Sequence, residues 1–385
     1  MNILLLAPQP FFQERGTPIA VKILARSLAE MGHDVHLLVF AEGKNIDIPG
    51  VTLHRHQAVP GLTGIKPGFS VKKIICDFLL FLKCIRLVRK YDYELLHAVE
   101  ESVFMAFIIK TVFKIPYVYD MDSCMSLQLI DKLPLLKMIR RPMEWVEKIA
   151  ITGSIGVLPV CESMENMVLR YAPHRLVVRL EDISLLDSET EGEEDLRKEL
   201  GIDGLMVMYV GNLEKYQGID LLLEGFGEAL KKNSTLSLVL IGGNSGDIHS
   251  YEKKAQHLGI SEKVHFCGGR PLGQLGFYLR QADILVSPRT QGENTPMKIY
   301  SYLDSGVSIV ATRLATHTQV LDDTIACLVE SSAEEMAKGL LCLAENEVTR
   351  QDMASRAKKR VNDEYSLPAF QRKLSSFYDS VQTLL

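Results

Sequence analysis

The segment from residue 287 to residue 298 combines residue types that could bind an anionic ligand. Its polar loop runs into Thr295 and Pro296, which suit the N-cap and the first position of a helix. We therefore predict a helix over 296–303. Lys298 then lies in the first turn, where the helix dipole disfavours a cation unless an anion binds nearby. The same loop also holds Arg289, Gly292, Glu293 and Asn294.

Two earlier loops repeat the order of strand, glycine and helix. In APQPFFQERGTPIAV, Gly16 allows close approach of the backbone, Pro18 begins a predicted helix, and Arg15 adds positive charge. A helix N-terminus, with free N–H groups and a positive dipole, can bind phosphate. In MYVGNLEKYQG, Lys215 is the only cation of the loop. A plain turn between a strand and a helix is the alternative in both places.

Several histidines and one glutamate also lie at or near strand ends. His97 and Glu100 close the fourth predicted strand, where a ligand contact and a structural hydrogen bond are both open. His317 has the same two interpretations. His54 and His56 share one face of a short strand because side chains alternate with period two. No third ligand for a metal is evident near them, so we expect both at the surface.

The elements that must position these residues are apolar runs that alternate with helix-period segments. This alternation predicts parallel sheets covered by helices on both faces. In the first half we predict strands at 3–7, 34–39, 51–54, 94–97, 117–119 and 155–159, with helices at 18–31, 71–90, 102–113, 141–151 and 163–171. In the second half we predict strands at 205–210, 236–241, 264–267, 284–287 and 308–311, with helices at 219–231, 248–258, 272–280 and 296–303.

The domain organisation follows from the length and from an acidic break in the pattern. The chain has 385 residues, which suits two domains or three small ones. The stretch 181–195 has a linker-like composition with no basic residue. We expect two tandem Rossmann-like domains over 1–182 and 183–365, and a final helix over 366–385 that crosses back to the first. Such domains bind ligands at the carboxyl ends of their strands, so we expect a cleft between them.

Composition excludes several classes of protein. Hydrophobic residues make up 47% and charged residues 24%, as in ordinary globular proteins, and the net charge of −5 gives no global attraction to nucleic acid. The seven cysteines form no CxxC pair, which argues against a zinc cluster or a disulfide framework and favours the cytoplasm. The N-terminus lacks signal-peptide features, and no apolar run reaches the ~18–20 residues of a membrane helix.

The pattern SPR…NTP…KIYSYL…SG…IVATR…THTQVL resembles the nucleotide-sugar site of family 4 glycosyltransferases, which have the GT-B fold. The resemblance extends over nearly the whole chain. RGTPIAV is similar to the family's first glycine loop, VGNLEKYQG to the loop that opens its second domain, and YELLHAVEE and PYVYDMDSC to strand ends of its first domain. The resemblance implies transfer of a sugar, with retention and without a metal, from a UDP-sugar or GDP-sugar.

The resemblance also implies roles for individual residues. Glu293 would contact the donor sugar, and Asp122, in the slot of a sugar-binding histidine, would be the second catalytic residue. Ser301 stands where the family has a carboxylate that holds the ribose. The implied donor-binding residues are Gly16, Thr17, Gly211, Asn212, Lys215, Arg289, Asn294, Thr295, Pro296, Lys298 and Ser301, the implied acceptor contacts are Arg15, His97 and Glu100, and no residue is assigned to a metal.

The sequence departs from the family pattern at two phosphate-binding positions. Asn212 and Gln217 stand where the family commonly has arginine and lysine. Lys215, Lys298 or Arg289 could supply the missing charge. These departures, with those at the sugar and ribose slots, leave an alternative open: a non-catalytic GT-B protein that binds a glycan or a partner.

A third interpretation starts from the motif Asp120-Met121-Asp122. Two carboxylates after a buried strand can bind Mg²⁺, as in metal-dependent phosphotransferases or GT-A glycosyltransferases. A GT-A enzyme has one nucleotide-binding domain of this kind, whereas this chain shows two complete α/β units. We therefore expect a strand-end turn, with Asp122 as a substrate contact.

The segment 66–90 holds seven basic residues and one acidic residue. A helix over 71–90 would be basic and amphipathic, as in helices that lie on anionic membranes. The alternative is a helix that covers the sheet and turns its cations to solvent. The resemblance and the cysteine pattern predict a bacterial protein of the cytoplasm, and the first interpretation of this helix would place it on the inner face of the membrane. It would act in polysaccharide or glycolipid biosynthesis on a glycan or lipid-linked acceptor, without nucleic acid as a partner.

Overall fold

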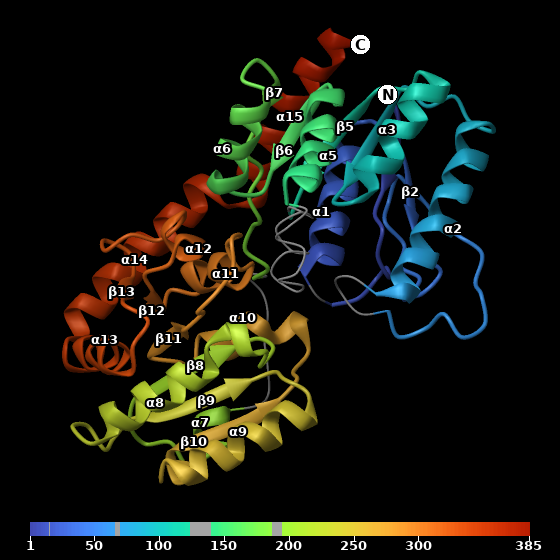
Figure 1. Cartoon of the computed structure of the whole chain (residues 1–385). Helices are drawn as coiled ribbons and strands as arrows, with labels where there is room; N and C mark the ends of the chain where they lie inside the picture. Colours follow the sequence, from blue (N-terminus) through green and yellow to red (C-terminus); the bar gives the residue numbers. More distant parts are fainter. Residues whose placement is uncertain (15, 66–69, 124–139, 187–194) are drawn as a thin grey trace. The chain divides into compact units, whose positions relative to one another are not determined.

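The computed structural model describes the chain except residues 15, 66–69, 124–139 and 187–194 (Figure 1). The described chain divides into two compact units. One consists of Met1–Glu181 with Gln371–Leu385, and the other is Asp182–Phe370. None of the helices in the described part of the chain has the length and apolarity needed to span a bilayer.

The first unit is built on a parallel sheet of seven strands in the order β3-β2-β1-β4-β5-β6-β7. The apolar runs form its central strands, which are buried on both faces as the sequence pattern requires, whereas the two edge strands are only partly buried. The strands are β1 (Asn2–Leu6), β2 (Asp34–Val39), β3 (Val51–Arg55), β4 (Leu95–Val99), β5 (Tyr117–Met121), β6 (Gly156–Pro159) and β7 (Leu176–Val177).

Helices cover both faces of this sheet. One apolar cluster joins alternate strand residues such as Leu4 and Leu6 to α2, α3, α5 and α6, so these four helices share a face. The strand residues between them, such as Leu5, are also buried, so the other face is covered too. The helices are α1 (Gly16–Glu30), α2 (Val71–Val88), α3 (Ser102–Phe113), α5 (Arg140–Gly153), α6 (Glu162–Tyr171) and α15 (Leu367–Leu384).

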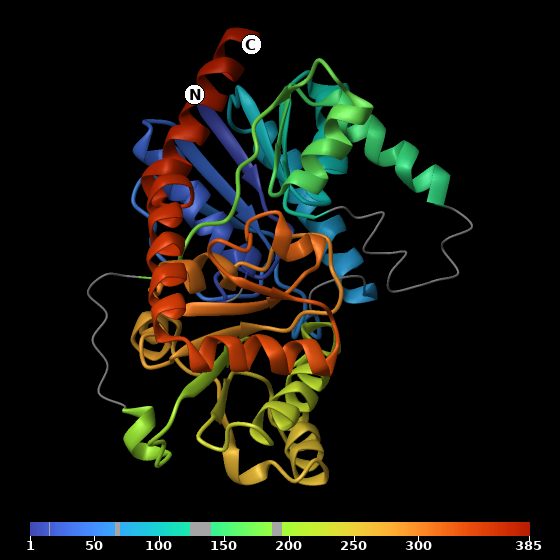
Figure 2. The ribbon, with the colours of Figure 1, turned by 90° about the vertical axis from the view of Figure 1, so that its left-hand side faces the viewer.

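The last helix, α15, lies against the strands of the first unit (Figure 2). The Tyr378 hydroxyl is 2.7 Å from Nδ1 of His97, which lies on β4 between two residues of the cluster above and therefore points to the opposite face. The Lys373 ammonium is 2.5 Å from a carboxylate oxygen of Glu181. The ring of Phe377 lies so close to Gly156 on β6 that an added Cβ would be 2.7 Å from it. Residues about 280 apart in sequence thus form one core.

The second unit is built on a parallel sheet of six strands in the order β10-β9-β8-β11-β12-β13. Two apolar clusters cover its faces. The strands are β8 (Met206–Val210), β9 (Ser237–Ile241), β10 (Val264–Gly268), β11 (Ile284–Ser287), β12 (Ser308–Thr312) and β13 (Cys327–Val329). The helices are α7 (Leu196–Glu199), α8 (Ile219–Leu230), α9 (Ser245–His257), α10 (Leu275–Leu279), α11 (Lys298–Asp304), α12 (Ala315–Thr318), α13 (Ala333–Glu345) and α14 (Glu347–Glu364).

The predicted fold class, two α/β Rossmann-like units with parallel sheets, is confirmed. Individual boundaries differ for local reasons. Helix α9 begins at Ser245, not at 248, because Asn244 Oδ1 accepts hydrogen bonds from the amides of Gly246 and Asp247 and so caps the helix. The helix predicted over 272–280 is a 3-10 turn followed by the short α10. The strands β7 and β13 were not predicted, since two or three residues are too few for a periodic signal.

Arg55, at the end of β3, holds two loops of the first unit together. Its guanidinium donates to the carbonyl oxygens of Phe11 (2.5 Å), Phe40 (3.0 Å) and Lys44 (2.9 Å). Because hydrogen bonds from a charged donor are strong, we expect Arg55→Leu to lower the free energy of unfolding by at least about 2 kcal/mol. Urea denaturation measures the change, with Arg26→Leu, at an exposed position of α1, as the matched control. Equal stability of the two variants would contradict this role.

Candidate functional site

In the second unit, the loops that follow β8 and β11 lie against each other at the carboxyl ends of the strands. The Thr290 amide donates a hydrogen bond of 3.0 Å to the Tyr216 carbonyl. Gly218 follows the short helical turn Lys215–Gln217 and has a left-handed backbone with φ of 76°. A Cβ at this position would be 1.9 Å from the Pro288 carbonyl oxygen. Glycine is therefore required both by the backbone conformation and by the neighbouring loop.

We expect Gly218→Ala to destabilise the protein by at least about 2 kcal/mol, because the added methyl group must push the two loops apart. Gly227→Ala is the matched control, since a Cβ at this helical position would make only an ordinary contact at 3.6 Å. Alanine there should leave stability equal or slightly higher. Thermal unfolding of both variants is the measurement. A Gly218→Ala protein as stable as the wild type would show that the loops do not need this contact.

Two cations lie where these loops meet. The Lys298 ammonium is 3.1 Å from the Gln217 side-chain oxygen and 3.9 Å from the centre of the Tyr209 ring. The Arg289 guanidinium donates to the carbonyl oxygens of Gln291 (2.6 Å) and Asn294 (3.2 Å). It also lies over the ring of Tyr216. All of these partners are neutral, and neither cation forms an ion pair with a carboxylate among the described residues.

The positive charges of these two side chains are therefore not neutralised by a carboxylate of the described residues, and both are partly shielded from water. Arg289 is buried and Lys298 is partly buried. Burial lowers the pKa of Lys298 well below its usual range, and the positive charge of Arg289 lowers it further. Burial also lowers the pKa of Arg289. An anion bound between Arg289 and Lys298 would offset the repulsion between the two cations. It would also stabilise the charged forms of both side chains. The geometry therefore suits an anionic ligand such as a diphosphate.

The turn before α11 differs from the sequence prediction. The helix begins at Lys298 with Met297 at its N-cap, so Thr295 and Pro296 are not the N-cap and first helical residue. The reason is that the chain has already turned: the Ile299 amide donates to the Pro296 carbonyl at 2.9 Å. The Thr295 hydroxyl is buried and has no hydrogen-bond partner among the described residues. It is thus an available donor beside Lys298.

The loop that carries Glu293 and Asn294 is fixed through its carbonyl groups. The Asn294 carbonyl accepts from the Thr316 hydroxyl at 2.6 Å, and the Glu293 carbonyl accepts from the Gln319 amide at 2.9 Å. Glu293 itself is exposed. The loop backbone is therefore held by α12 and its C-cap residue, while the carboxylate lies at the surface, where it can reach a ligand.

The other predicted donor-binding residues of this unit differ in their surroundings. Asn212 and Lys215 are exposed on the loop after β8, and Gly211 lies so close to Lys298 that a Cβ there would be 3.0 Å from its ammonium. Ser301 is buried on α11, and its hydroxyl accepts a hydrogen bond of 3.1 Å from the Leu185 amide. Of these four residues, Gly211 is the one that the structure places beside Lys298.

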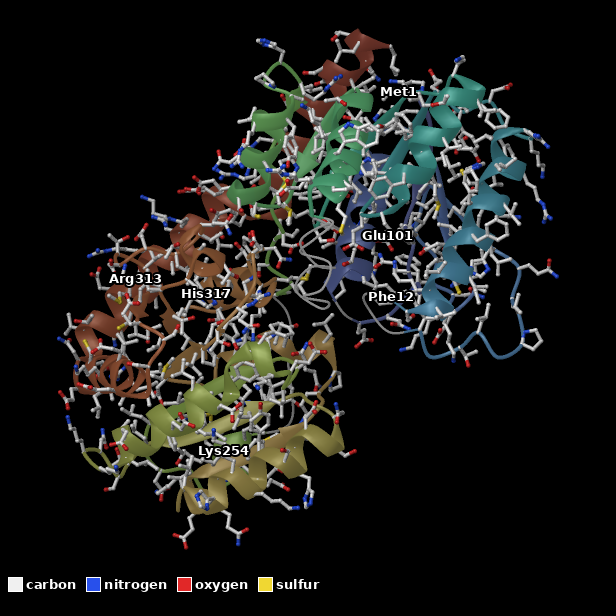
Figure 3. The ribbon with its side chains drawn as sticks, in the orientation of Figure 1. Met1, Phe12, Glu101, Lys254, Arg313 and His317 are labelled. Carbon is white, nitrogen blue, oxygen red and sulfur yellow. The ribbon has the colours of Figure 1, made fainter. Side chains whose placement is uncertain are left out.

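His317, labelled in Figure 3, is fully buried beneath the same loop. Its Nε2 is 2.9 Å from the Ser287 hydroxyl at the end of β11, and its Nδ1 is 2.8 Å from the Thr312 carbonyl. Burial lowers its pKa to about 4. Both ring nitrogens are thus used in structural hydrogen bonds, which favours the structural interpretation left open by the sequence. His317 positions the strand end that carries Arg289.

The buried histidine gives a pH dependence of stability. Its pKa is about 4 in the folded chain and close to 6.5 when unfolded, so the unfolded state binds the proton first as the pH falls. We expect the free energy of unfolding to fall by up to about 3 kcal/mol between pH 6.5 and pH 4 from this group. Urea denaturation of the wild type and of His317→Gln at both pH values isolates the contribution of this histidine. An equal pH dependence in that variant would contradict the assignment.

In the first unit, the predicted anion loop leads into α1, which begins at Gly16. A Cβ at Gly16 would have no protein atom within 4 Å, so the fold itself gives no steric reason for glycine there. Thr17 is partly buried in the first turn. Arg15 lies outside the described residues. The open space in front of Gly16 is compatible with close approach of a ligand.

The remaining predicted residues of the first unit lie near the carboxyl ends of β4 and β5. Nε2 of His97 is 3.3 Å from a carboxylate oxygen of Asp120, and Tyr378 holds the other ring nitrogen. Glu100 has a left-handed backbone with φ of 51° and accepts a hydrogen bond from the Ser123 hydroxyl. Asp122 is partly buried just after β5. The sequence did not indicate Tyr378, which is far along the chain from His97.

Two other predictions about polar residues can be compared with the structure. The expectation that His56 lies at the surface is wrong: it is buried, and its Nε2 accepts from the Ala41 amide at 3.2 Å. His54 is partly buried beside His36 and Tyr91. Within the described residues, no group of three or more His, Cys, Asp or Glu side chains could hold a metal ion.

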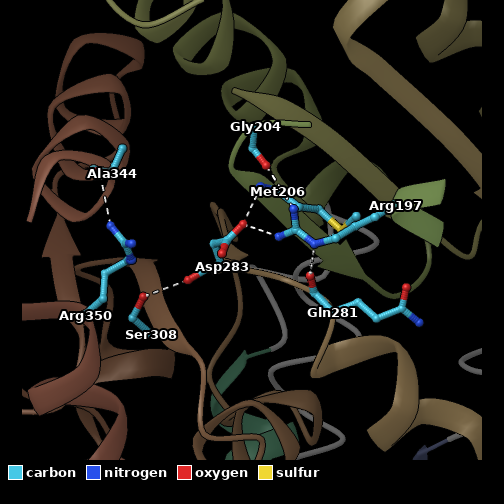
Figure 4. A network of polar contacts seen from close by, with 8 residues as sticks. All are labelled: Arg197, Gly204, Met206, Gln281, Asp283, Ser308, Ala344 and Arg350. Carbon is cyan, nitrogen blue, oxygen red and sulfur yellow. Dashed lines mark hydrogen bonds and ion pairs between the residues drawn. The ribbon is translucent and has the colours of Figure 1, made fainter. Parts of the chain in front are cut away.

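A polar network at the opposite end of the second sheet serves structure. Asp283, before β11, accepts a hydrogen bond from the Met206 amide at the start of β8 and pairs with Arg197 (Figure 4). The Arg197 guanidinium also donates to the Gln281 carbonyl at 3.1 Å and the Gly204 carbonyl at 2.9 Å. All of these partners belong to segments near the amino ends of β8 and β11. The network therefore holds these strand ends and the start of the unit together.

Each half of the chain matches a family model. The model "Glycosyltransferase Family 4" matches residues 15–179, and the model "Glycosyl transferases group 1" matches residues 192–360. A D-inositol 3-phosphate glycosyltransferase of Corynebacterium aurimucosum is 24% identical and covers 96% of this chain and 92% of its own length.

Solved structures show the same fold. A sucrose-phosphate synthase from Thermosynechococcus elongatus has a TM-score of 0.81 at 18% identity and covers 100% of both chains. Anabaena HepE in complex with UDP-glucose has a TM-score of 0.76 at 15% identity and covers 99% of this chain and 100% of its own. At such identities the likeness establishes the GT-B fold alone.

Proposed function

Because the chain belongs to the family 4 glycosyltransferases, with the GT-B fold, we propose that it transfers a sugar from a nucleotide-diphosphate sugar to an acceptor hydroxyl. One observation carries the proposal for this chain's own residues. Arg289 and Lys298 form a pair of cations without a carboxylate partner in the described residues, at the carboxyl ends of β8 and β11. A diphosphate supplies the negative charge that this pair lacks.

The diphosphate is the leaving group, and its developing charge is the main obstacle to the reaction. Arg289 and Lys298 are preorganised by the Tyr216 and Tyr209 rings, so they stabilise that charge without rearranging. The Thr295 hydroxyl donates to a phosphate oxygen. Charge-assisted hydrogen bonds of this type are the strong class. Gly211 lets the ligand approach, since a side chain there would contact the Lys298 ammonium.

We propose a retaining reaction that needs no metal. The acceptor approaches on the face from which the diphosphate departs, and the departing phosphate oxygen takes the proton of the acceptor hydroxyl. A separate catalytic base is then unnecessary. The two cations take the part that a metal ion has in other transferases. Activity unchanged by EDTA is the expected result, and loss of activity that Mg²⁺ restores would contradict it.

The remaining predicted contacts complete the proposal. Glu293 accepts hydrogen bonds from the donor sugar, and Asn212, Lys215, Asn294, Pro296 and Ser301 contact the nucleotide. In the first unit, Asp122 contacts sugar. The Gly16–Thr17 turn with Arg15 contacts an anionic group, and His97 and Glu100 contact the acceptor. We propose a glycan or lipid-linked acceptor used in polysaccharide or glycolipid synthesis in the bacterial cytoplasm. The inositol phosphate in the name of a full-length relative supports a polyol hydroxyl as the nucleophile.

Thermal shift with a panel of nucleoside diphosphates and nucleotide sugars tests the donor. A ligand present at 100 times its dissociation constant should add about 2.7 kcal/mol of stability. Uridine and guanosine diphosphates with their glucose, galactose and mannose derivatives form the panel, and the nucleoside monophosphates are the control for the second phosphate. We expect the diphosphates to stabilise more strongly. Equal shifts from monophosphates and diphosphates would contradict the role of the paired cations.

A non-catalytic binding protein is the second candidate, and two observations favour it. Ser301, in the slot of the ribose carboxylate, already uses its hydroxyl as acceptor for the Leu185 amide. Gln217 likewise uses its side-chain oxygen for Lys298. A protein of this kind would bind nucleotide sugars or glycans without consuming them. Release of nucleoside diphosphate separates the two candidates, because only the enzyme produces it.

A further inference from the structure

Helix α2 of the first unit is apolar on two opposite sides. Its inward side, Cys76, Leu80, Cys84 and Leu87, is buried against the sheet. Its outward side carries an exposed row at a spacing of three to four residues, which is one face of a helix. The row consists of Val71, Ile75, Phe78 and Leu82, with exposed fractions of 71%, 41%, 59% and 37%.

The helix covers the sheet and turns cations to solvent, as the simple alternative for the segment expects, but its outward side also carries this apolar row. The outermost positions of the first three turns are apolar, and the same line then continues into the exposed Arg86 and Arg89. Lys72 is exposed beside the row. The only carboxylate of the helix, Asp77, is partly buried near the Lys73 ammonium at 4.0 Å, so it does not offset the outer charges. The outward side therefore carries an apolar row over its first three turns, with Lys72 beside it, and is cationic at its last turn.

Neighbouring helices extend the apolar surface. Helix α3 packs against both α2 and α5 on the same face of the sheet. On α3, Val112 is 64% exposed, and on α5 the single tryptophan of the chain, Trp145, is also 64% exposed. Tryptophan is enriched at membrane interfaces because its ring is apolar and its N–H is polar. Exposed apolar side chains on three helices that pack side by side mark a candidate binding surface.

We infer that the outward side of α2, extended by Val112 and Trp145, docks on an anionic lipid surface. The apolar row enters the boundary between headgroups and acyl chains, and Arg86, Arg89 and Lys72 contact anionic headgroups. The positive charge of this surface favours an anionic lipid surface over a second copy of the chain as its binding partner. A two-fold dimer through this surface would repeat the same cationic patch on both partners and bring like charges together. The anionic membrane supplies the opposite charge.

The test is co-sedimentation of the full chain with vesicles of phosphatidylcholine alone and with added phosphatidylglycerol. We expect binding to the mixed vesicles only, and release by salt. Phe78→Ser with Leu82→Ser should weaken binding at least ~100-fold, because both side chains lose their burial in lipid. Arg86→Gln with Arg89→Gln should weaken it on the order of 30-fold. All four positions are at least partly exposed to solvent on the outward side, so the variants should keep the fold.

Matched controls change equally exposed residues on the second unit. They are Val348→Ser with Leu258→Ser for apolar surface, and Lys358→Gln with Lys359→Gln for charge. Both should bind vesicles as the wild type does. Equal binding to neutral and anionic vesicles, or controls as weak as the α2 variants, would overturn the inference. So would a dimer in solution that Phe78→Ser with Leu82→Ser converts to a monomer without vesicles present.

A second readout uses Trp145. Brominated phosphatidylcholine in the mixed vesicles should quench its fluorescence in the wild type, and should not quench it in the Phe78→Ser, Leu82→Ser variant. An unquenched Trp145 in vesicle-bound wild type would overturn the extension of the surface to α5. Both measurements are independent of catalysis, so a failed transfer assay does not affect them.

Discussion

Replacement of Glu293 by glutamine should lower the rate of nucleoside diphosphate release by about 10²–10³-fold, with little effect on stability. The carboxylate is exposed on a loop whose backbone carbonyls are held by Thr316 and Gln319, so the loop keeps its position when the charge is removed. Glutamine keeps the size of the side chain and loses the charge. Strong hydrogen bonds from sugar hydroxyls to a carboxylate are therefore weakened in the transition state.

The measurement is release of nucleoside diphosphate with water or an acceptor as nucleophile, with the melting temperature as the control for folding. Glu262→Gln, an exposed carboxylate before β10, is the matched variant and should keep wild-type activity. If Glu293→Gln also keeps it, the loop before α11 has no part in the chemistry.

Lys298→Met should weaken binding of a nucleoside diphosphate by about 10–100-fold, as expected for loss of a charged hydrogen-bond donor. Methionine retains most of the length and packing of the side chain over the Tyr209 ring. Because burial lowers the pKa of Lys298 well below its usual range, loss of this charge should not destabilise the ligand-free protein. Higher stability combined with weaker binding is the expected signature.

Isothermal titration of the diphosphate measures this effect. Lys231→Met, on an exposed ion pair with Glu228 at the end of α8, is the control for loss of a lysine. The variant in which Gln217→Lys and Lys298→Gln are combined exchanges the two side chains that are in contact at 3.1 Å, and should recover part of the affinity. Unchanged affinity in Lys298→Met would remove this lysine from the site.

The sequence predicted the sheets well because their central strands are buried on both faces. The strand Asp34–Val39 and the helix Ser102–Phe113 were predicted to the residue, since an apolar run and a helical period are local signals. The glycine loops were also predicted, because the order of strand, glycine and helix along the chain is a local signal. Arg289 and Lys298 were identified as possible substitutes for missing cations, and the structure places both where the two loops meet.

Features that depend on tertiary contacts were not predictable. The hydrogen bond between His97 and Tyr378 joins the fourth strand to the last helix, and no local pattern links them. The start of α11 at Lys298 depends on how the preceding loop is held, so the Thr-Pro signal placed the helix start too early. The outward apolar row of α2 could not be told from its inward row, because a sequence pattern does not say which side of a helix meets the sheet.

Direct detection of sugar transfer tests the central claim. The purified chain is incubated with each nucleotide-diphosphate sugar of the panel, in the presence of EDTA and a lipid and glycan extract as acceptor, and nucleoside diphosphate and new glycoside are measured together by NMR. We predict that at least one donor is consumed, that the anomeric configuration is retained, and that Glu293→Gln reduces consumption about 10²-fold or more. Tight binding of a donor by wild-type protein with no nucleoside diphosphate released would contradict the enzyme and establish the binding protein instead.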